Sequence, residues 1–180
     1  MRPPEVMDTR RLKLRKLVEG DAPTVFDRWA QDPRVTRYLV WSPHTSIEEA
    51  EEHARKCVAS WEAGTSFTWM MEDRKTGEAV GSIGAYPSGH TVELGYLVAP
   101  DSWGQGYMVE AIEAVSEWFL TQPTIFRIWA EVDVENRPSA RVLEKASFEK
   151  EGTFRCGIMC PNLSSRPRDA FIFGRIEEPT

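Results

Sequence analysis

Hydrophobic and polar residues alternate in several short segments of the chain, and this period of two is typical of half-buried β-strands. In residues 10–17, leucines alternate with basic residues. Residues 67–72 and 79–86 flank a turn at Gly77, which predicts a β-hairpin. Further strands are predicted at 90–98, 125–133, 149–154 and 170–175.

Helices are predicted where apolar residues recur at helical spacing between start and stop signals. Ser46 and Glu49 have the spacing of a capping box, and Gly64 follows the last helical position near Ala63. Asp21 can cap an earlier helix, which Pro33 stops or redirects. Two further helices are predicted at 107–120 and from 136 or 137 to 145.

The predicted order β-α-α-β-β-β-α-β-α-β-β is that of an α+β fold with a mostly antiparallel sheet. Only the strand–helix–strand unit from Val92 to Asp133 is expected to be parallel and right-handed. With 180 residues the chain can bury a sizeable core. No repeat or linker interrupts it, so residues 1–180 are predicted to form a single domain.

The most informative segment joins the strand that ends at Val98 to the helix that begins at Tyr107. Gly104 and Gly106 lie between them, and glycine lets the backbone turn sharply and approach a ligand closely. The first N–H groups of a helix lack intrahelical partners and carry the positive end of its dipole. Strand, glycine turn and helix N-terminus together predict a phosphate-binding site.

Two common nucleotide-binding motifs do not fit this turn. A Walker loop has Lys followed by Ser or Thr after its last glycine, whereas Tyr107 and Met108 stand there. A dinucleotide motif has a third Gly or Ala three residues after the second glycine, whereas residue 109 is Val. A glycine turn that only joins a strand to a helix remains the alternative to a phosphate site.

The turn resembles the pyrophosphate loop of the GCN5-related N-acetyltransferase (GNAT) family, whose members bind acetyl coenzyme A (acetyl-CoA). The family pattern is Gln/Arg-x-x-Gly-x-Gly/Ala. Trp103 occupies the first place, Gly106 the fourth and Met108 the sixth, so two of the three places depart from the pattern. The motif Glu-Leu-Gly-Tyr … Trp-Gly-x-Gly-Tyr is similar to that of the RimJ/RimL-type ribosomal-protein N-terminal acetyltransferases, in which Trp at the first place is common.

This resemblance extends, in order, over nearly the whole chain. Residues 9–17 and 21–39 resemble the opening strand and first helical turns of the RimJ/RimL type. Residues 136–148 resemble its final helix motif, with Ser147 where Gly is usual. The resemblance implies a GNAT-like mixed sheet that is flanked by helices and splays apart after the cofactor strand, with the pantetheine arm of acetyl-CoA in the opening.

Two residues are the candidates for catalysis. Glu93 lies in an otherwise apolar strand, where burial would raise its pKa toward the range useful to a general base. The resemblance implies that Glu93 faces the acceptor and deprotonates the amine through water; a solvent-facing glutamate is the alternative. It also implies that Ser139 protonates or hydrogen-bonds the departing sulfur, although serine is ordinary in a first helical turn. The loop histidines His44 and His90 are outside candidates for a base. No Cys–His arrangement in the sequence argues for an acyl-enzyme.

The predicted cofactor contacts come from the glycine turn and its neighbours. Backbone N–H groups of the turn would hold the pyrophosphate, and backbone groups of the preceding strand would lie along the pantetheine arm. Asn136 is either a cofactor contact, as the resemblance implies, or a helix cap, or both. Arg141 and Lys145 could meet a terminal phosphate or be solvated helix charges. The predicted cofactor-binding residues are Leu97, Val98, Trp103, Gly104, Gln105, Gly106, Tyr107, Met108, Asn136 and Ser139.

Composition excludes some classes of function. The formal net charge of −6 argues against generic nucleic-acid binding. No apolar run approaches the ~20 residues of a membrane span, and no secretory signal is apparent, so a cytoplasmic location is expected. The cysteines Cys57, Cys156 and Cys160 are odd in number and scattered, which indicates reduced thiols and no metal site.

Three functions stay open at the level of sequence. The resemblance implies acetyl transfer to a protein or peptide N-terminal amine by direct attack in a ternary complex. The alternatives are acetylation of a small-molecule amine, such as an antibiotic or amino-acid derivative, and a non-catalytic acyl-CoA-binding module. Acceptor specificity is expected in residues 34–60 and in the late loop 156–169. An exposed edge strand could pair in a homodimer.

Overall fold

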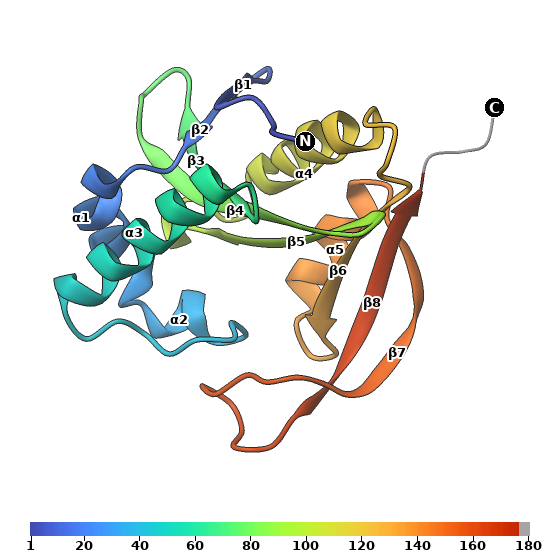
Figure 1. Ribbon diagram of the computed structural model, residues 1–180. Helices are drawn as coiled ribbons and strands as arrows, with labels where there is room; N and C mark the ends of the chain where they lie inside the picture. The colour runs from blue at the N-terminus through green and yellow to red at the C-terminus, as the bar shows by residue number, and fades with distance from the viewer. Residues whose placement is uncertain (177–180) are drawn as a thin grey trace.

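The computed structural model describes residues 1–176 and contains one eight-stranded sheet with helices on both faces (Figure 1). The strand order is β1-β2-β3-β4-β5-β6-β8-β7. The strands are β1 (Val6–Asp8), β2 (Leu12–Lys16), β3 (Phe67–Asp73), β4 (Ala79–Ser88), β5 (Thr91–Val98), β6 (Arg127–Asp133), β7 (Glu149–Ile158) and β8 (Arg168–Ile176). The helices are α1 (Ala22–Val25), α2 (Pro33–Thr36), α3 (Ile47–Ala63), α4 (Tyr107–Leu120) and α5 (Arg137–Lys145), with shorter helical turns at Glu19–Asp21, Phe26–Ala30 and Pro100–Ser102.

The sheet confirms the predicted α+β plan, and it forks in its interior. All neighbouring strands are antiparallel except β5 and β6. These two pair only between Thr91–Glu93 and Arg127–Trp129 within the described residues. Beyond Glu93, β5 stays paired with β4 as far as Val98, while β6 continues beside β8. The fork between β5 and β6 is the splay that the sequence resemblance implies.

The two faces of the sheet have separate cores, and strand alternation assigns each side chain of β5 to one of them. Val92 and Leu94 pack with buried residues of α4 and α5. Leu97 packs instead against the cluster that includes residues of α1 and α3. Glu93 has the parity of Leu97, so its side chain lies on the face of α1, α2 and α3. The fold therefore turns Glu93 away from the main core.

The N-terminal part of the chain differs from the prediction. Residues 6–8 form the short edge strand β1, which the sequence did not indicate. The expected helix from Asp21 is divided into α1 and a π-helical turn. The Asp21 carboxylate does not cap this helix, because the Arg15 guanidinium binds both its oxygens at 2.7 and 2.8 Å. A charge-assisted pair of this kind is stronger than a neutral cap bond.

The predicted capping box between Ser46 and Glu49 does not form, because Glu49 binds a different residue. Ser46 is the N-cap of α3, but its side chain makes no cap hydrogen bond. Glu49 accepts from the N–H of Thr45 at 2.7 Å, one residue earlier than expected. The extended backbone at Ser46 brings the preceding N–H toward the first helical turn. The predicted stop is confirmed, since Gly64 ends the helix with a φ of 72°.

The edges of the sheet are β1 and β7. Most residues of β7 are exposed. Strand pairing between chains requires unpaired backbone groups at an exposed edge, and β7 is such an edge. A homodimer formed through this edge stays a prediction.

Candidate active site

The glycine turn has the backbone conformation that a phosphate-binding loop needs. Gly104 and Gly106 have φ of 74° and 78°, which residues with a Cβ rarely adopt. Gly106 is the N-cap of α4. Within residues 1–176, no backbone acceptor occupies the N–H groups of Gly104, Gln105 or Gly106, and the first N–H groups of α4 lack intrahelical acceptors. The turn therefore offers a row of free donors.

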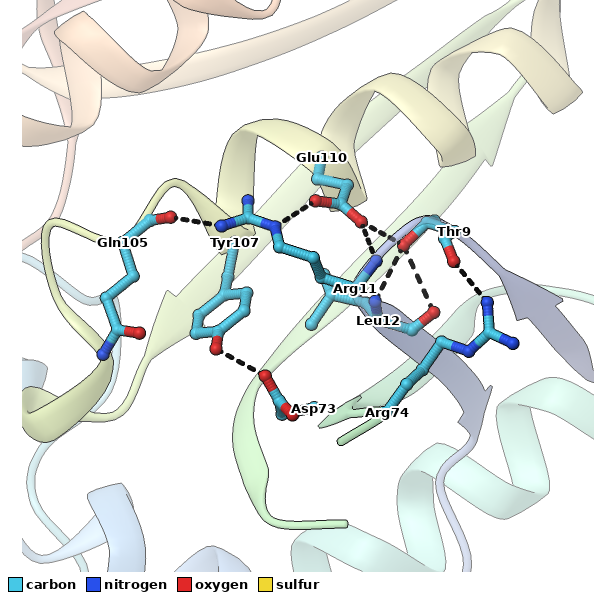
Figure 2. A network of polar contacts seen from close by, with 8 residues as sticks. All are labelled: Thr9, Arg11, Leu12, Asp73, Arg74, Gln105, Tyr107 and Glu110. Atoms are coloured by element: carbon cyan, nitrogen blue, oxygen red, sulfur yellow. Dashed lines mark hydrogen bonds and ion pairs between the residues drawn. The ribbon is translucent and has the colours of Figure 1, made fainter. Parts of the chain in front are cut away.

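Arg11 holds this turn from the side of β2 (Figure 2). Its guanidinium donates to the Gln105 carbonyl at 2.8 Å and to Glu110 in the first turn of α4 at 2.7 Å. The backbone N–H of Arg11 also donates to Glu110, at 2.6 Å. In a trans peptide the carbonyl and the following N–H point in opposite directions. Since the Gln105 carbonyl points to Arg11, the Gly106 N–H points away from it.

Tyr107 adds a second brace to the same turn. Its hydroxyl donates to Asp73 at the end of β3, and the Arg11 guanidinium lies 4.9 Å from the centre of its ring (Figure 2). Thr9 also donates to Glu110. The start of α4 is thus fixed to the connection between β1 and β2 and to the end of β3, and no local pattern indicates these contacts.

The two departures from the GNAT loop pattern have structural explanations. The Trp103 indole N–H donates to the Val98 carbonyl at 2.8 Å, so this residue ties the turn to the end of β5. Met108 is only 3% exposed, and its side chain packs into the main core. A large residue is accommodated at this place because its side chain points away from the turn's free N–H groups.

A cavity of about 430 Å³ follows the turn and the fork. All of the predicted cofactor-binding residues except Gln105 line it. The Gln105 carbonyl binds Arg11 and its amide donates to the Asp101 carbonyl, so both groups are engaged outside the cavity. Arg34, Arg141 and Lys145 also line it and give it positive charge. Arg141 and Lys145, the sequence candidates for a terminal phosphate, thus line the same cavity as the glycine turn, and Arg34 was not expected.

Strand pairing separates the roles of Leu97 and Val98. The Ala99 N–H donates to the Val80 carbonyl of β4 at 2.9 Å. Backbone groups of successive residues point to alternate edges of an antiparallel strand, so those of Leu97 face β4 and those of Tyr96 and Val98 face the fork. The backbone part of the Leu97 prediction is therefore corrected: Leu97 contributes its side chain to the cavity.

A second cavity, of about 500 Å³, opens on the face of α1, α2 and α3, and Glu93 lines it. The two cavities meet, because several residues line both. The shared residues are Tyr38, Leu39, Tyr96, Leu97, Asn136 and Ser139. The predicted catalytic pair, Glu93 and Ser139, is thus brought into one cavity. Two cavities with a common wall can hold two substrates side by side, which is the arrangement that transfer of a group from one to the other requires.

Ser139 and Asn136 keep the helix roles that their residue types favour and also line the shared wall. The side-chain oxygen of Asn136, Oδ1, accepts the Ser139 N–H at 3.3 Å, as an N-cap of α5 should. The Ser139 hydroxyl lies 2.8 Å from the Tyr96 hydroxyl. Burial raises the pKa of Tyr96, so its hydroxyl stays protonated at neutral pH. Tyr96 is the partner of Ser139 that sequence reasoning did not assign.

The carboxylates that line the Glu93 cavity differ in whether a neighbouring cation or hydrogen-bond donor stabilises their ionised form. Burial raises the pKa of Glu93. Burial and the negative charge of Glu93 raise the pKa of Glu131 on β6. Burial also acts on Asp133, but hydrogen bonds from Arg168 hold the pKa of this carboxyl below its usual range. Glu131 was missed in the sequence, because alternation along β6 does not reveal that the neighbouring strand departs.

Two histidines from the α3 side line the Glu93 cavity. They are His44, which the sequence offered as an outside candidate for a base, and His53, which it did not. The sulfur of Cys57 lies 3.5 Å from His53 Nε2, a pair that the spacing of four residues on a helix could have indicated. Burial lowers the pKa of His53 and raises that of Cys57, so the pair is neutral and lacks the thiolate that a nucleophile requires. His90 lines neither cavity.

The two segments expected to set acceptor specificity lie against each other. The Asn162 side-chain amide, in the late loop, donates to the Thr36 carbonyl at 2.7 Å and to the Trp41 carbonyl at 2.8 Å. Cys160 in the same loop contacts the Tyr38 carbonyl at 3.5 Å. These contacts join the late loop to the wall of the Glu93 cavity across more than a hundred residues of sequence.

The acetyltransferase (GNAT) domain family matches residues 11–149 of this chain. The uncharacterized N-acetyltransferase YoaA of Bacillus subtilis (strain 168) is 33% identical over 153 residues, which cover 83% of this chain and 86% of the relative. Among solved structures, the fold is similar to that of RimL, a ribosomal alpha-N-protein acetyltransferase, in complex with coenzyme A (TM-score 0.84, 20% identity, 96% of this chain and 98% of that chain). It is also similar to the microcin self-immunity acetyltransferase MccE in complex with acetyl-CoA and AMP (TM-score 0.86, 15% identity, 97% and 98%).

The chain therefore belongs to the GNAT acetyltransferase family, and it is an N-acetyltransferase. Among residues 1–176, no three or more His, Cys, Asp or Glu side chains are grouped so that they could hold a metal ion. In the same residues, no helix combines the length and the apolar character needed to cross a membrane.

Proposed function

We propose that this enzyme moves an acetyl group from acetyl-CoA to the N-terminal amine of a protein or peptide, by direct attack in a ternary complex. The observation that carries this proposal is the common wall of the two cavities, which includes Ser139 and Tyr96. We call the cavity along the glycine turn the donor cavity and the Glu93 cavity the acceptor cavity. A donor in the first and an acceptor in the second would meet at the common wall, beside Glu93. Holding two reactants in attack geometry supplies much of the rate of such a reaction.

The donor cavity fits acetyl-CoA by its chemistry. The free N–H groups of the glycine turn suit a pyrophosphate, and Arg141 and Lys145 suit a terminal phosphate. The fork leaves the backbone groups of Tyr96 and the N–H of Val98 facing the opening, where a pantetheine amide could pair with them, while the Val98 carbonyl is taken by the Trp103 indole. RimL and MccE, which share the fold, were solved with coenzyme A and acetyl-CoA respectively, and this supports the same cosubstrate here.

The residues of this chain supply two proton transfers. Glu93 takes one proton from the acceptor ammonium through water, and the neutral amine attacks the thioester carbonyl carbon. A C–N bond forms and the C–S bond breaks, with the electron pair leaving on sulfur. Ser139, hydrogen-bonded to Tyr96, donates to that sulfur. The amine nitrogen loses its second proton when the C–S bond breaks, and this proton replaces the one that Ser139 gives to the sulfur. The products are an amide and a free thiol, and Glu93 returns its proton to solvent.

An N-terminal amine is the proposed acceptor because RimL, by its name, acts on a ribosomal protein and shares the fold. Acetylation of a small-molecule amine is the second candidate. MccE, a self-immunity acetyltransferase with the same fold, favours it. A non-catalytic acyl-CoA-binding module is the third reading, and the unpaired Glu93 in the acceptor cavity argues against it.

Release of free thiol from acetyl-CoA tests the proposal. Short peptides with free N-termini should support release, and the same peptides with blocked N-termini should not. Small primary amines complete the panel. Release with small amines alone would replace the proposal by the second candidate. Binding of acetyl-CoA, measured by calorimetry, without release on any acceptor would favour the module.

A further inference from the structure

Two glutamates of different strands lie on the same face of the sheet where it forks. Glu93 on β5 is in register with Trp129 on β6. Glu131 follows Trp129 by two residues, so it lies on the same face, about 7 Å further along β6. Both glutamates line the acceptor cavity. The fork thus places two carboxylates beside the wall that the acceptor cavity shares with the donor cavity.

Neither carboxylate has a counter-ion in the part of the chain that the structure describes. Within residues 1–176, no side-chain hydrogen bond or ion pair reaches Glu93 or Glu131, and both are partly buried. Asp133, on the same strand, is compensated by Arg168 and by the Glu135 N–H. Two uncompensated like charges facing one cavity are unfavourable unless a cation joins them.

The rest of the acceptor cavity carries no positive charge. Its lining includes no Lys or Arg among residues 1–176. Burial lowers the pKa of both histidines, His44 and His53, so the imidazoles are neutral at pH 7. The remaining wall is largely apolar or aromatic, and includes Trp29, Tyr38, Leu39, Val40 and Trp41. An acceptor carboxylate would find no cation in this cavity.

We infer that the acceptor is a cationic primary amine with an apolar or aromatic body and no carboxylate beside the amine, and that Glu131 binds the ammonium together with Glu93. This inference rests on the proposed function and narrows its acceptor. It admits an N-terminal residue, whose neighbouring carbonyl is a neutral amide, and it excludes free amino acids. Glu131 is assigned as a binding residue, whereas Glu93 also accepts the proton.

A matched set of acceptors tests the inference: phenethylamine, L-phenylalanine amide and L-phenylalanine share one aromatic body and one primary amine. We expect kcat/KM for L-phenylalanine to be lower than for phenethylamine by at least about tenfold, the effect of one uncompensated charge. Glu131→Gln should raise the KM for phenethylamine by about tenfold and leave the KM for acetyl-CoA unchanged. Glu131→Lys should favour L-phenylalanine over phenethylamine.

Glu117→Gln on the exposed side of α4 makes the same charge change outside both cavities and should alter none of these values. Equal use of phenethylamine and L-phenylalanine by the wild type, or an unchanged ratio in Glu131→Gln, would overturn the inference. An unchanged KM for acetyl-CoA also shows that the variants are folded.

Binding measured without turnover separates this inference from the proposed function. Calorimetry on the protein loaded with coenzyme A should show binding of phenethylamine and none of hydrocinnamate, which carries a carboxylate in place of the amine. If this preference is present but no acceptor is turned over, the inference holds and the proposed function fails. If neither compound binds, or hydrocinnamate binds as well, the inference fails.

Discussion

The cavities proposed here for the donor and for the acceptor are built in different ways. The donor cavity contains the free backbone N–H groups of the glycine turn, which are held in place by Arg11, 94 positions from Gln105, and by Trp103, bound to the end of β5. The acceptor cavity presents side chains from several strands, helices and loops, and two of its carboxylates are uncompensated. A backbone site suits a constant donor, whereas a side-chain site can change its acceptor by substitution. The two cavities should therefore respond to different substitutions.

The largest effect is expected from Gly106→Val in the donor cavity. Valine is strained at a φ of 78°, and its Cβ would lie 3.5 Å from the Arg11 guanidinium, so the substitution should displace the turn that presents the free N–H groups. We expect acetyl-CoA binding, measured by calorimetry, to weaken by about 100-fold. Gly64→Val, at the end of α3 with a φ of 72°, carries the same strain at a residue that lines neither cavity and should leave binding intact. Unchanged binding in Gly106→Val would refute the phosphate role of the turn.

Glu93→Gln changes the acceptor cavity alone. A glutamine cannot take a proton from the ammonium, so kcat should fall by about 100-fold. The KM for acetyl-CoA should stay the same, because Glu93 does not line the donor cavity. Steady-state kinetics at saturating acceptor measure both values, with Glu117→Gln as the control. Full turnover in Glu93→Gln would place the base elsewhere.

Arg11→Met tests whether the donor site depends on its brace. Loss of the bonds to Gln105 and Glu110 frees the peptide that presents the Gly106 N–H, so the KM for acetyl-CoA should rise about tenfold with the acceptor KM unchanged. Within residues 1–176, the neighbouring Arg74 side chain binds the Thr9 carbonyl and the Asp8 carboxylate and neither Gln105 nor Glu110, so Arg74→Met is the matched control (Figure 2). Equal effects of the two variants would mean that Arg11 acts on stability alone.

The pH profile should report the coupling of the two acceptor carboxylates. Because burial raises the pKa of Glu93, the acid limb of kcat/KM should lie above the ordinary glutamate value of about 4.3. Activity is lost as pH falls through this limb, since the base becomes protonated. Glu131→Gln removes a like charge and should move the limb to lower pH. A limb in the same place for both proteins would show that the charges do not interact.

Other titratable groups also face the acceptor cavity: Tyr38, Tyr86, Tyr96, Asp133, His44 and His53. They are common to the wild type and the Glu131→Gln variant, so the difference between the two profiles isolates Glu131.

The smallest effect is expected from Ser147→Gly, a substitution outside both cavities that acts on stability alone. Ser147 has a φ of 63°, the left-handed conformation in which the resembling proteins have glycine. A residue with a Cβ is strained there, so Ser147→Gly should raise the free energy of unfolding by about 1 kcal/mol, measured by urea denaturation. Ser147→Ala keeps the strain and should show no gain. Neither variant should alter the KM for acetyl-CoA or for the acceptor.

The donor side could be predicted further from the sequence than the acceptor side, and the reason is physical. Gly104, Gly106 and the start of α4 are local signals, because the conformation of a turn depends on a few adjacent residues. Arg11 could not be assigned, because its contact with Gln105 spans 94 positions. The position of Glu131 in the alternating pattern of β6 is that of any strand residue. It lines the cavity only because β5 separates from β6 beyond Trp129, which the sequence of β6 does not indicate. The strand β1 is three residues long, too short to show a period.

The fork between β5 and β6 also has a consequence for the stability of the protein. A sheet usually leaves its unpaired backbone at the outer strands, whereas here a gap lies between two inner strands. A molecule that fills the gap binds the native chain and not the unfolded one, so mass action makes it a stabilising partner. The metabolic supply of that molecule would then influence how long the polypeptide escapes degradation.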